Sequence, residues 1–292
     1  MKRIVRLLLS LVFCILPLCA APASATLRVI SLYPGHTDNI AALGAAESIV
    51  AISHNDDLES LQDRPRLPAN VTPEALLAHR PDVVVMRTLN ERANPHLAAV
   101  LTKAGVAVHV LEPPSWEGFE TYLAELAEIL GIAPDEGFAR LERIRQGAEQ
   151  AGIAGRGNVT APRVFLEATG KEIHTCSPGS WAARVIALCG GVNAAADARP
   201  IRPGSPLAPW GVERAVMLAD QGLDIYLVQQ GAMNASTKPD VLARPWFAAF
   251  GNVRLAFIEE RCLSRPSLAG LERGTALLLA ILYPQTTGET KP

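Results

Sequence analysis

The feature that most constrains this chain is an alternation of short apolar strands with helical segments, which occurs twice along the sequence. The runs with strand character are 28–32, 48–52, 82–85, 106–111, 163–166, 223–228 and 253–258. Strands that alternate with helices at this spacing are typical of a parallel sheet covered on both faces. We therefore expect an α/β fold in which the sheets are parallel.

Corresponding segments recur at a nearly constant distance, which predicts two similar lobes. The strands at 28 and 163 are 135 residues apart, and the helix-opening acids Glu74 and Glu213 are 139 residues apart. The length of 292 residues also exceeds the ~100–200 residues of a usual domain. After the first strand, the sequence Tyr33-Pro34-Gly35 predicts a turn. We expect His36 or Thr37 to cap the N-terminus of the next helix.

The stretch between the lobes has a helical pattern and almost no strand signal. Leu123, Leu126 and Leu130 keep a spacing of three to four residues, and Leu141 resumes it. We expect one helix over 135–150 that bridges the lobes, and a loop at 153–160. The predicted organisation is a first lobe at 26–114, a helical connector at 115–158 and a second lobe at 159–292.

The N-terminus has the three parts of a secretory signal peptide. Lys2, Arg3 and Arg6 precede an apolar run from Leu7 to Leu16, and an Ala-rich site ends at Ala25. The run is shorter than the ~20 apolar residues that a membrane-spanning helix needs. We predict that residues 1–25 are removed after Ala25 and that the mature protein is periplasmic.

Two other fates of the N-terminus stay open. The apolar run could act as a membrane anchor, and Cys19 could carry a lipid, although Leu18 before it is bulkier than such sites prefer. Cys176, Cys189 and Cys262 remain in the mature chain. An odd number allows at most one internal disulfide, and the sequence does not decide whether one forms.

Charge and motifs exclude several classes of function. The chain has a net charge of −2 and no basic run after the N-terminal segment, so nucleic acid is not an expected partner. It contains no G-x-S-x-G, no P-loop and no G-x-G-x-x-G. We therefore expect a protein that is not an enzyme and has no catalytic residues.

Several local strings resemble one family of exported proteins. They are Arg28–Leu32, Ala42–Ala45, Pro81–Val85, Cys189–Asn193 and Leu282–Pro284. Their order and spacing are similar to those of the substrate-binding proteins of ABC importers for iron complexes and corrinoids. The resemblance implies two α/β lobes bridged by a long helix that limits closure, with the ligand in the cleft between them.

The resemblance also implies a partner. Members of this family use one exposed glutamate on each lobe to dock onto arginines of an ABC permease dimer, which works with a cytoplasmic ATPase. Glu74 and Glu213 occupy matching positions in the two lobes and are the candidates for this role. The alternative is that each acid merely complements a helix dipole, which contributes ~0.3–1 kcal/mol.

Ligand contacts are expected from loops that follow the carboxyl ends of strands, where open α/β sheets place their sites. The candidates are Tyr33, His36, His54, Arg87, Trp116, His174, Trp210, Met233 and Arg265. Of these, Arg87 and Arg265 are expected on opposite lobes, facing a shared groove. No prosthetic group is expected, because the bound metal complex would be the transported ligand.

The charged residues and the aromatic content of the chain indicate which class of ligand it binds. Arg87, Arg261, Arg265 and Lys171 suit an anionic chelate, because guanidinium groups pair with carboxylate or catecholate oxygens. The resemblance implies that a corrinoid binder would present several aromatic rings to the flat macrocycle, whereas only 5% of the residues are aromatic. An iron chelate such as a siderophore is therefore the first expectation. Cobalamin or another corrinoid, haem, or a bare metal ion held by His36, His54 and His174 are the alternatives.

Overall fold

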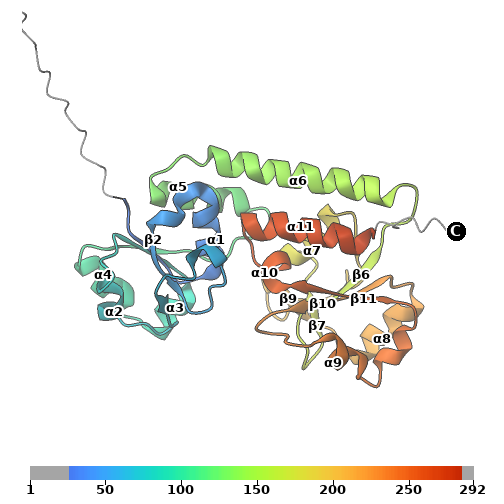
Figure 1. Ribbon diagram of the computed structural model, residues 1–292. Helices are drawn as coiled ribbons and strands as arrows, with labels where there is room; N and C mark the ends of the chain where they lie inside the picture. Colours follow the sequence, from blue (N-terminus) through green and yellow to red (C-terminus); the bar gives the residue numbers. More distant parts are fainter. Residues whose placement is uncertain (1–25, 285–292) are drawn as a thin grey trace, which may run out of the picture.

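The computed structural model describes residues 26–284 and shows two lobes, each built around a parallel sheet. In Figure 1 the lobes lie side by side, and one long helix runs along the edge of both. This arrangement confirms the expected α/β class with two lobes. The proposed signal peptide, residues 1–25, lies outside the described residues.

The first lobe contains a five-stranded sheet in the order β3-β2-β1-β4-β5, and all of its neighbouring strands are parallel. Its strands are β1 (Val29–Ser31), β2 (Ile49–Ser53), β3 (Arg66–Leu67), β4 (Val83–Met86) and β5 (Ala107–Val110). Its helices are α1 (Pro34–Ile40), α2 (Pro73–Leu77), α3 (Thr88–Ala93) and α4 (Leu97–Lys103). The central strands β1 and β4 are fully buried, and apart from Ser31 their residues are apolar, as expected for strands covered on both faces.

The second lobe contains a four-stranded parallel sheet in the order β11-β10-β6-β8. Its strands are β6 (Arg163–Glu167), β8 (Val192–Asn193), β10 (Ile225–Gln230) and β11 (Arg254–Glu259). Its helices are α7 (Trp181–Leu188), α8 (Val212–Asp220), α9 (Lys238–Leu242), α10 (Glu260–Leu263) and α11 (Leu268–Leu282).

One local expectation was wrong, and one pair of strands was not predicted. Helix α1 begins at Pro34 with Tyr33 as its extended N-cap residue, so neither His36 nor Thr37 caps it. Proline is favoured at this first helical position because it lacks the N–H that would stay unpaired. A short antiparallel pair, β7 (His174–Cys176) with β9 (Leu207–Pro209), was not expected at all.

The connector consists of two helices, α5 (Phe119–Leu130) and α6 (Asp135–Arg156). Helix α6 is the bridging helix expected over 135–150, but it continues to Arg156, so the loop expected from 153 starts later. Gly131 ends α5 in a left-handed conformation with φ 67°, which glycine adopts without steric cost. The lobe boundaries at 114 and 158 remain predictions.

A single apolar core joins the two lobes behind the cleft. Its buried members include Ile40 of the first lobe, Leu123 of α5, Leu141 of α6 and Leu271 of α11. Buried Asn39 adds polar contacts between the lobes. Its Nδ2 donates to the Pro266 carbonyl at 3.0 Å, and its Oδ1 accepts the Leu268 N–H at 3.0 Å. These contacts fix one lobe against the other.

Among residues 26–284, no helix combines the length and apolarity needed to cross a bilayer. Cys176, Cys189 and Cys262 are all buried and unpaired in the described part of the chain. Burial raises the pKa of the Cys176 thiol to about 11, so it is a poor nucleophile at neutral pH.

Candidate functional site

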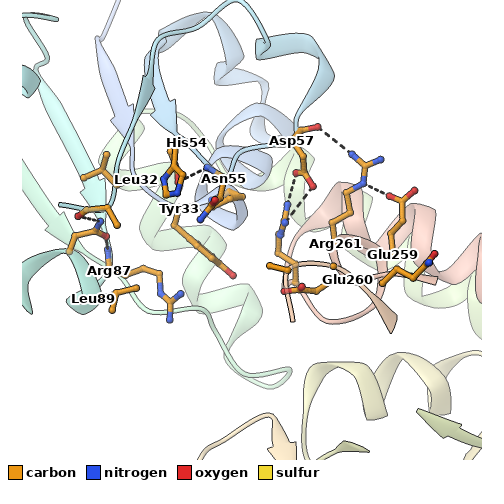
Figure 2. A pocket seen from close by; sticks show the side chains of 18 residues that line it. Leu32, Tyr33, His54, Asn55, Asp57, Arg87, Leu89, Glu259, Glu260 and Arg261 are labelled. Carbon is orange, nitrogen blue, oxygen red and sulfur yellow. Dashed lines mark hydrogen bonds and ion pairs between the residues drawn. The ribbon is translucent and has the colours of Figure 1, made fainter. Parts of the chain in front are cut away.

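The main candidate site is a pocket of about 610 Å³ between the two lobes (Figure 2). The first lobe contributes loops after β1, β2 and β4, which carry Tyr33, His54 and Arg87. The second lobe contributes residues that follow β10 and β11, including Arg261 and Arg265. The pocket therefore lies at the carboxyl ends of strands from both sheets, as open α/β sheets require.

Tyr33 forms the aromatic part of the pocket wall. The Arg87 guanidinium lies over its ring at 4.8 Å, and the edge of the His36 ring approaches it with centroids 5.0 Å apart. Gly35 is needed beneath the ring, because a Cβ at this position would lie 2.5 Å from a Tyr33 ring carbon. Burial raises the pKa of the Tyr33 phenol, so it stays protonated and is a poor anionic metal ligand.

Arg265 connects the two sides of the pocket. Its Nη1 lies 2.7 Å from Asp57 Oδ1 and 3.8 Å from Asp38 Oδ2, and both acids belong to the first lobe. Arg261 also reaches across, donating from Nη1 to the Asp57 carbonyl at 3.3 Å. Burial raises the pKa of Asp38 to about 6, although the nearby Arg265 opposes this shift.

The arginines of the pocket are already balanced by acids. Arg87 pairs with Glu112 at 3.4 Å, Arg261 with Glu259 at 2.5 Å and Arg265 with Asp57. Three arginines and three carboxylates line the pocket, because Glu260 joins Asp57 and Glu259. The positive surplus that the sequence suggested for an anionic chelate is therefore not present.

A second pocket of about 760 Å³ lies on the second lobe and shares Ala232 with the first. Its walls are the loop 169–174, which includes Lys171 and His174, and the loop 231–236, which includes Met233. Met233 is 48% exposed. Because Ala232 lines both pockets, the two pockets are adjacent.

His174 is held in a defined tautomer in this second pocket. Its Nδ1 lies 2.8 Å from the Glu172 carbonyl oxygen and 2.9 Å from Thr169 Oγ1. A carbonyl oxygen only accepts, so Nδ1 carries the proton and Nε2 of the neutral ring keeps a lone pair. Metal-ligating histidines are commonly oriented by such a bond on the other nitrogen.

Three of the residues that the sequence proposed as ligand contacts lie away from both pockets. His36 is fully buried, and its ring nitrogens lie 2.7 Å from the Tyr122 hydroxyl and 3.1 Å from the Leu111 carbonyl. Trp116 packs on Trp181 with ring centroids 4.9 Å apart. Trp210 is 7% exposed, in a core cluster of the second lobe beneath Arg214.

The structure also places the three histidines suggested for a bare metal ion, and it does not bring them together. Both nitrogens of His36 are used within the core, and burial lowers its pKa to about 4, so it stays neutral. His54 lines the first pocket and His174 lines the second. Within residues 26–284, no group of three or more His, Cys, Asp or Glu side chains could hold a metal ion.

Several pocket residues were not singled out from the sequence. Asp57 makes the contact between lobes, Leu89 is 58% exposed in the pocket wall, and Glu259 and Glu260 bring negative charge. Glu259 is the last residue of β11 and Glu260 directly follows it, so the strand-end rule that selected Arg261 also covers them. Leu89 carried no signal, because an isolated leucine after a strand is usually part of the core.

Comparison with known proteins places the fold and the pocket in a family. The model of the periplasmic binding protein family matches residues 29–250. The chain belongs to the periplasmic binding protein family. This membership, together with the relatives described next, confirms the resemblance to binding proteins for iron complexes and corrinoids.

The relatives of this family member differ in their ligands. A vitamin B12-binding protein of Yersinia pestis is 28% identical over 191 residues, which are 63% of this chain and 66% of the relative. The chain thus spans just under two thirds of the length of the curated relatives it matches. A periplasmic haem-binding protein of Vibrio cholerae has a TM-score of 0.71 at 20% identity, covering 89% of this chain and 100% of that chain. The periplasmic vitamin B12-binding protein of Vibrio cholerae has a TM-score of 0.61 at 22% identity, covering 88% and 98%.

The two acids expected to dock this periplasmic binding protein are both exposed. Glu74 stands in the first turn of α2, and Glu213 in the first turn of α8. Figure 1 shows α2 and α8 on different lobes, both on the side of the molecule away from α6.

Proposed function

We propose that the protein is a periplasmic receptor that binds a metal complex between its lobes and delivers it to an ABC permease. The pocket between two parallel sheets, held by α6 and one shared core, carries this proposal. Membership of the periplasmic binding protein family supports it. The proposal includes export through the predicted signal peptide of residues 1–25 and assigns no catalytic residue and no prosthetic group.

We further propose that the ligand is a complex of low net charge, of the corrinoid class. This departs from the iron chelate favoured by the sequence. The supporting observation is that Arg87, Arg261 and Arg265 are each paired with a carboxylate of the protein. A highly anionic chelate would have to compete with those acids and would meet the carboxylate of Glu260 as well.

Haem is the second candidate, and His174 is the reason. The lone pair on its Nε2 is available to a metal centre in the second pocket, while Nδ1 is fixed by the Glu172 carbonyl. The two ligands can be separated by one substitution. His174→Ala should abolish an imidazole-dependent shift of the haemin absorption band and change cyanocobalamin affinity little.

A titration with three ligands tests the choice. Isothermal calorimetry with cyanocobalamin, haemin and a ferric tris-catecholate complex compares a complex of zero net charge with a flat carboxylate macrocycle and a highly anionic chelate. The proposal predicts the tightest binding for cyanocobalamin. Tightest binding of the catecholate complex would restore the iron chelate, and binding of none of the three would count against a metal-complex receptor.

For docking, we propose that Glu74 and Glu213 each meet an arginine of a different permease subunit. Exposed charge pairs of this kind act mainly on encounter rate and orientation, and weaken with salt. The double variant Glu74→Lys with Glu213→Lys should abolish uptake but leave ligand affinity unchanged.

A matched control reverses two charges elsewhere. Asp135 and Glu136 are also exposed first-turn acids, but on α6, on the other side of the molecule (Figure 1). Uptake should survive Asp135→Lys with Glu136→Lys. Equal loss of uptake in both double variants would leave net charge, and not docking, as the cause.

A further inference from the structure

A buried carboxylate stands at the end of the central strand β6 of the second lobe. Glu167 is 0% exposed, and its oxygens accept hydrogen bonds from the Tyr226 hydroxyl at 2.5 Å and from Asn234 Nδ2 at 2.9 Å. Arg244 donates to both oxygens, at 2.5 Å from Nη1 and 3.0 Å from Nη2. Four donors thus satisfy one carboxylate and neutralise its charge.

This group is attached to the loop 231–236, which links β10 to α9. Asn234 is 3% exposed, and its Oδ1 accepts the Ser236 N–H at 3.1 Å. Arg244 Nη2 also donates to Ser236 Oγ at 3.0 Å, and Gln230 Nε2 donates to the Ser236 carbonyl at 3.0 Å. The loop is therefore fixed from beneath by side chains that point into the lobe.

The neighbouring loop depends on the same group. A Cβ on Gly170 would lie 2.7 Å from Ser236 Oγ and 2.8 Å from Asn234 Oδ1, so the two loops are in direct contact. Loop 169–174 holds His174, and Ala232 of the other loop lines both pockets. A shift of loop 231–236 would consequently change the wall of both pockets.

We propose that Glu167 and Arg244 form a positioning clamp that sets loop 231–236 and thereby the shape of the ligand site in the second lobe. Neither residue lines either pocket, so their effect on ligand passes through the loop. A buried ion pair adds little stability compared with apolar residues of similar volume, so fixing geometry is the role that this pair can fill. The effect on affinity rests on the proposed function, whereas the order of the loop does not.

The test removes both charges together. Glu167→Gln with Arg244→Met keeps the side-chain volumes similar and leaves no unpaired buried charge. The double variant should unfold at nearly the temperature of the wild type, while hydrogen exchange in 231–236 accelerates by about tenfold or more. Affinity for cyanocobalamin, measured by calorimetry, should fall by about tenfold because the loop must be reordered on binding.

A matched control removes an exposed ion pair. Arg184 and Glu117 lie 2.7 Å apart, with side chains 48% and 61% exposed. Glu117→Gln with Arg184→Met should leave both the exchange of 231–236 and the affinity unchanged.

The outcomes separate the clamp from the proposed function. A folded Glu167/Arg244 double variant with a protected loop and unchanged affinity would overturn the clamp. If that variant does not fold, Asn234→Ala with Ser236→Ala removes the hydrogen bonds of the loop to Glu167 and to Arg244 but keeps the ion pair, and unchanged exchange in 231–236 would then overturn the clamp. If the wild type does not bind cyanocobalamin, the proposed ligand is wrong. The rate of hydrogen exchange in 231–236 then tests by itself whether Glu167 and Arg244 fix the loop.

Discussion

At the residue scale, the charge that the pocket presents to a ligand depends on which carboxylate pairs with each arginine. Arg87 and Arg265 looked like free anion-binding groups in the sequence, because the acids that pair with them are distant along the chain. Arg261 pairs with Glu259, two positions before it, but a spacing of two residues does not by itself predict an ion pair. Arg265 and its partner Asp57 are separated by 208 positions. The sequence could therefore predict which arginines line the cleft, but not that they would be neutralised there.

Tyr33 provides the first prediction at this scale. Its ring is the aromatic wall of the first pocket, and an aromatic contact contributes ~0.5–1.5 kcal/mol beyond its buried area. Tyr33→Ala should weaken cyanocobalamin binding by roughly tenfold, whereas Tyr33→Phe should change it little. Calorimetry on both variants checks this, and equal losses would show that the hydroxyl, not the ring, makes the contact.

Asp38 provides a prediction on pH. Burial raises its pKa to about 6 in the folded protein, above the ~3.9 of an unfolded aspartate, so the folded state binds the proton more tightly. Its contribution to stability is therefore present below about pH 4 and is lost as the pH rises to about 6. Relative to Asp38→Asn, the wild type should lose up to about 3 kcal/mol over this interval. Urea unfolding of both proteins from pH 4 to 7 measures it, and a pH-independent difference would contradict the assignment.

At the element scale, the sequence correctly predicted the buried apolar strands and the long helix of the connector. The buried strands β1, β4, β6 and β10 and the helix α6 all lie where their patterns placed them. The short pair β7–β9 was not predicted, because neither strand lies in a continuous apolar run of the kind that marks β1, and their pairing joins segments 33 residues apart at Thr175 and Ala208. His36, Trp116 and Trp210 lie outside both pockets for a related reason: the strand-end rule locates a loop but not the direction of its side chains.

Helix α6 offers a paired prediction about packing. A Cβ on Gly152 would lie 2.7 Å from the Cys189 carbonyl oxygen, whereas a Cβ on Gly147 would meet nothing within 4 Å. Gly152→Ala should therefore destabilise the protein by ~1–3 kcal/mol through overpacking. Gly147→Ala should stabilise it by ~0.5–1 kcal/mol through helix propensity. Urea unfolding of both variants is the measurement, and the same sign for both would contradict this packing of α6 on the end of α7.

At the scale of the whole molecule, the two lobes share one core and are fixed by Asn39 and by the Arg265–Asp57 ion pair. Hinge closure would have to break buried contacts of α1, α6 and α11. We therefore expect ligand binding to change the shape only slightly. Small-angle scattering with and without cyanocobalamin tests this, and a large decrease in radius of gyration would show a hinge-closing receptor.

Native mass spectrometry is the decisive test of whether the cleft carries a metal complex, as we propose. Protein isolated from the periplasm of its own cells, without added ligand, should show one added mass per chain that dissociates as an intact metal complex. The account predicts the mass and the metal isotope pattern of a corrinoid. A bound sugar, peptide or other molecule without a metal would contradict it.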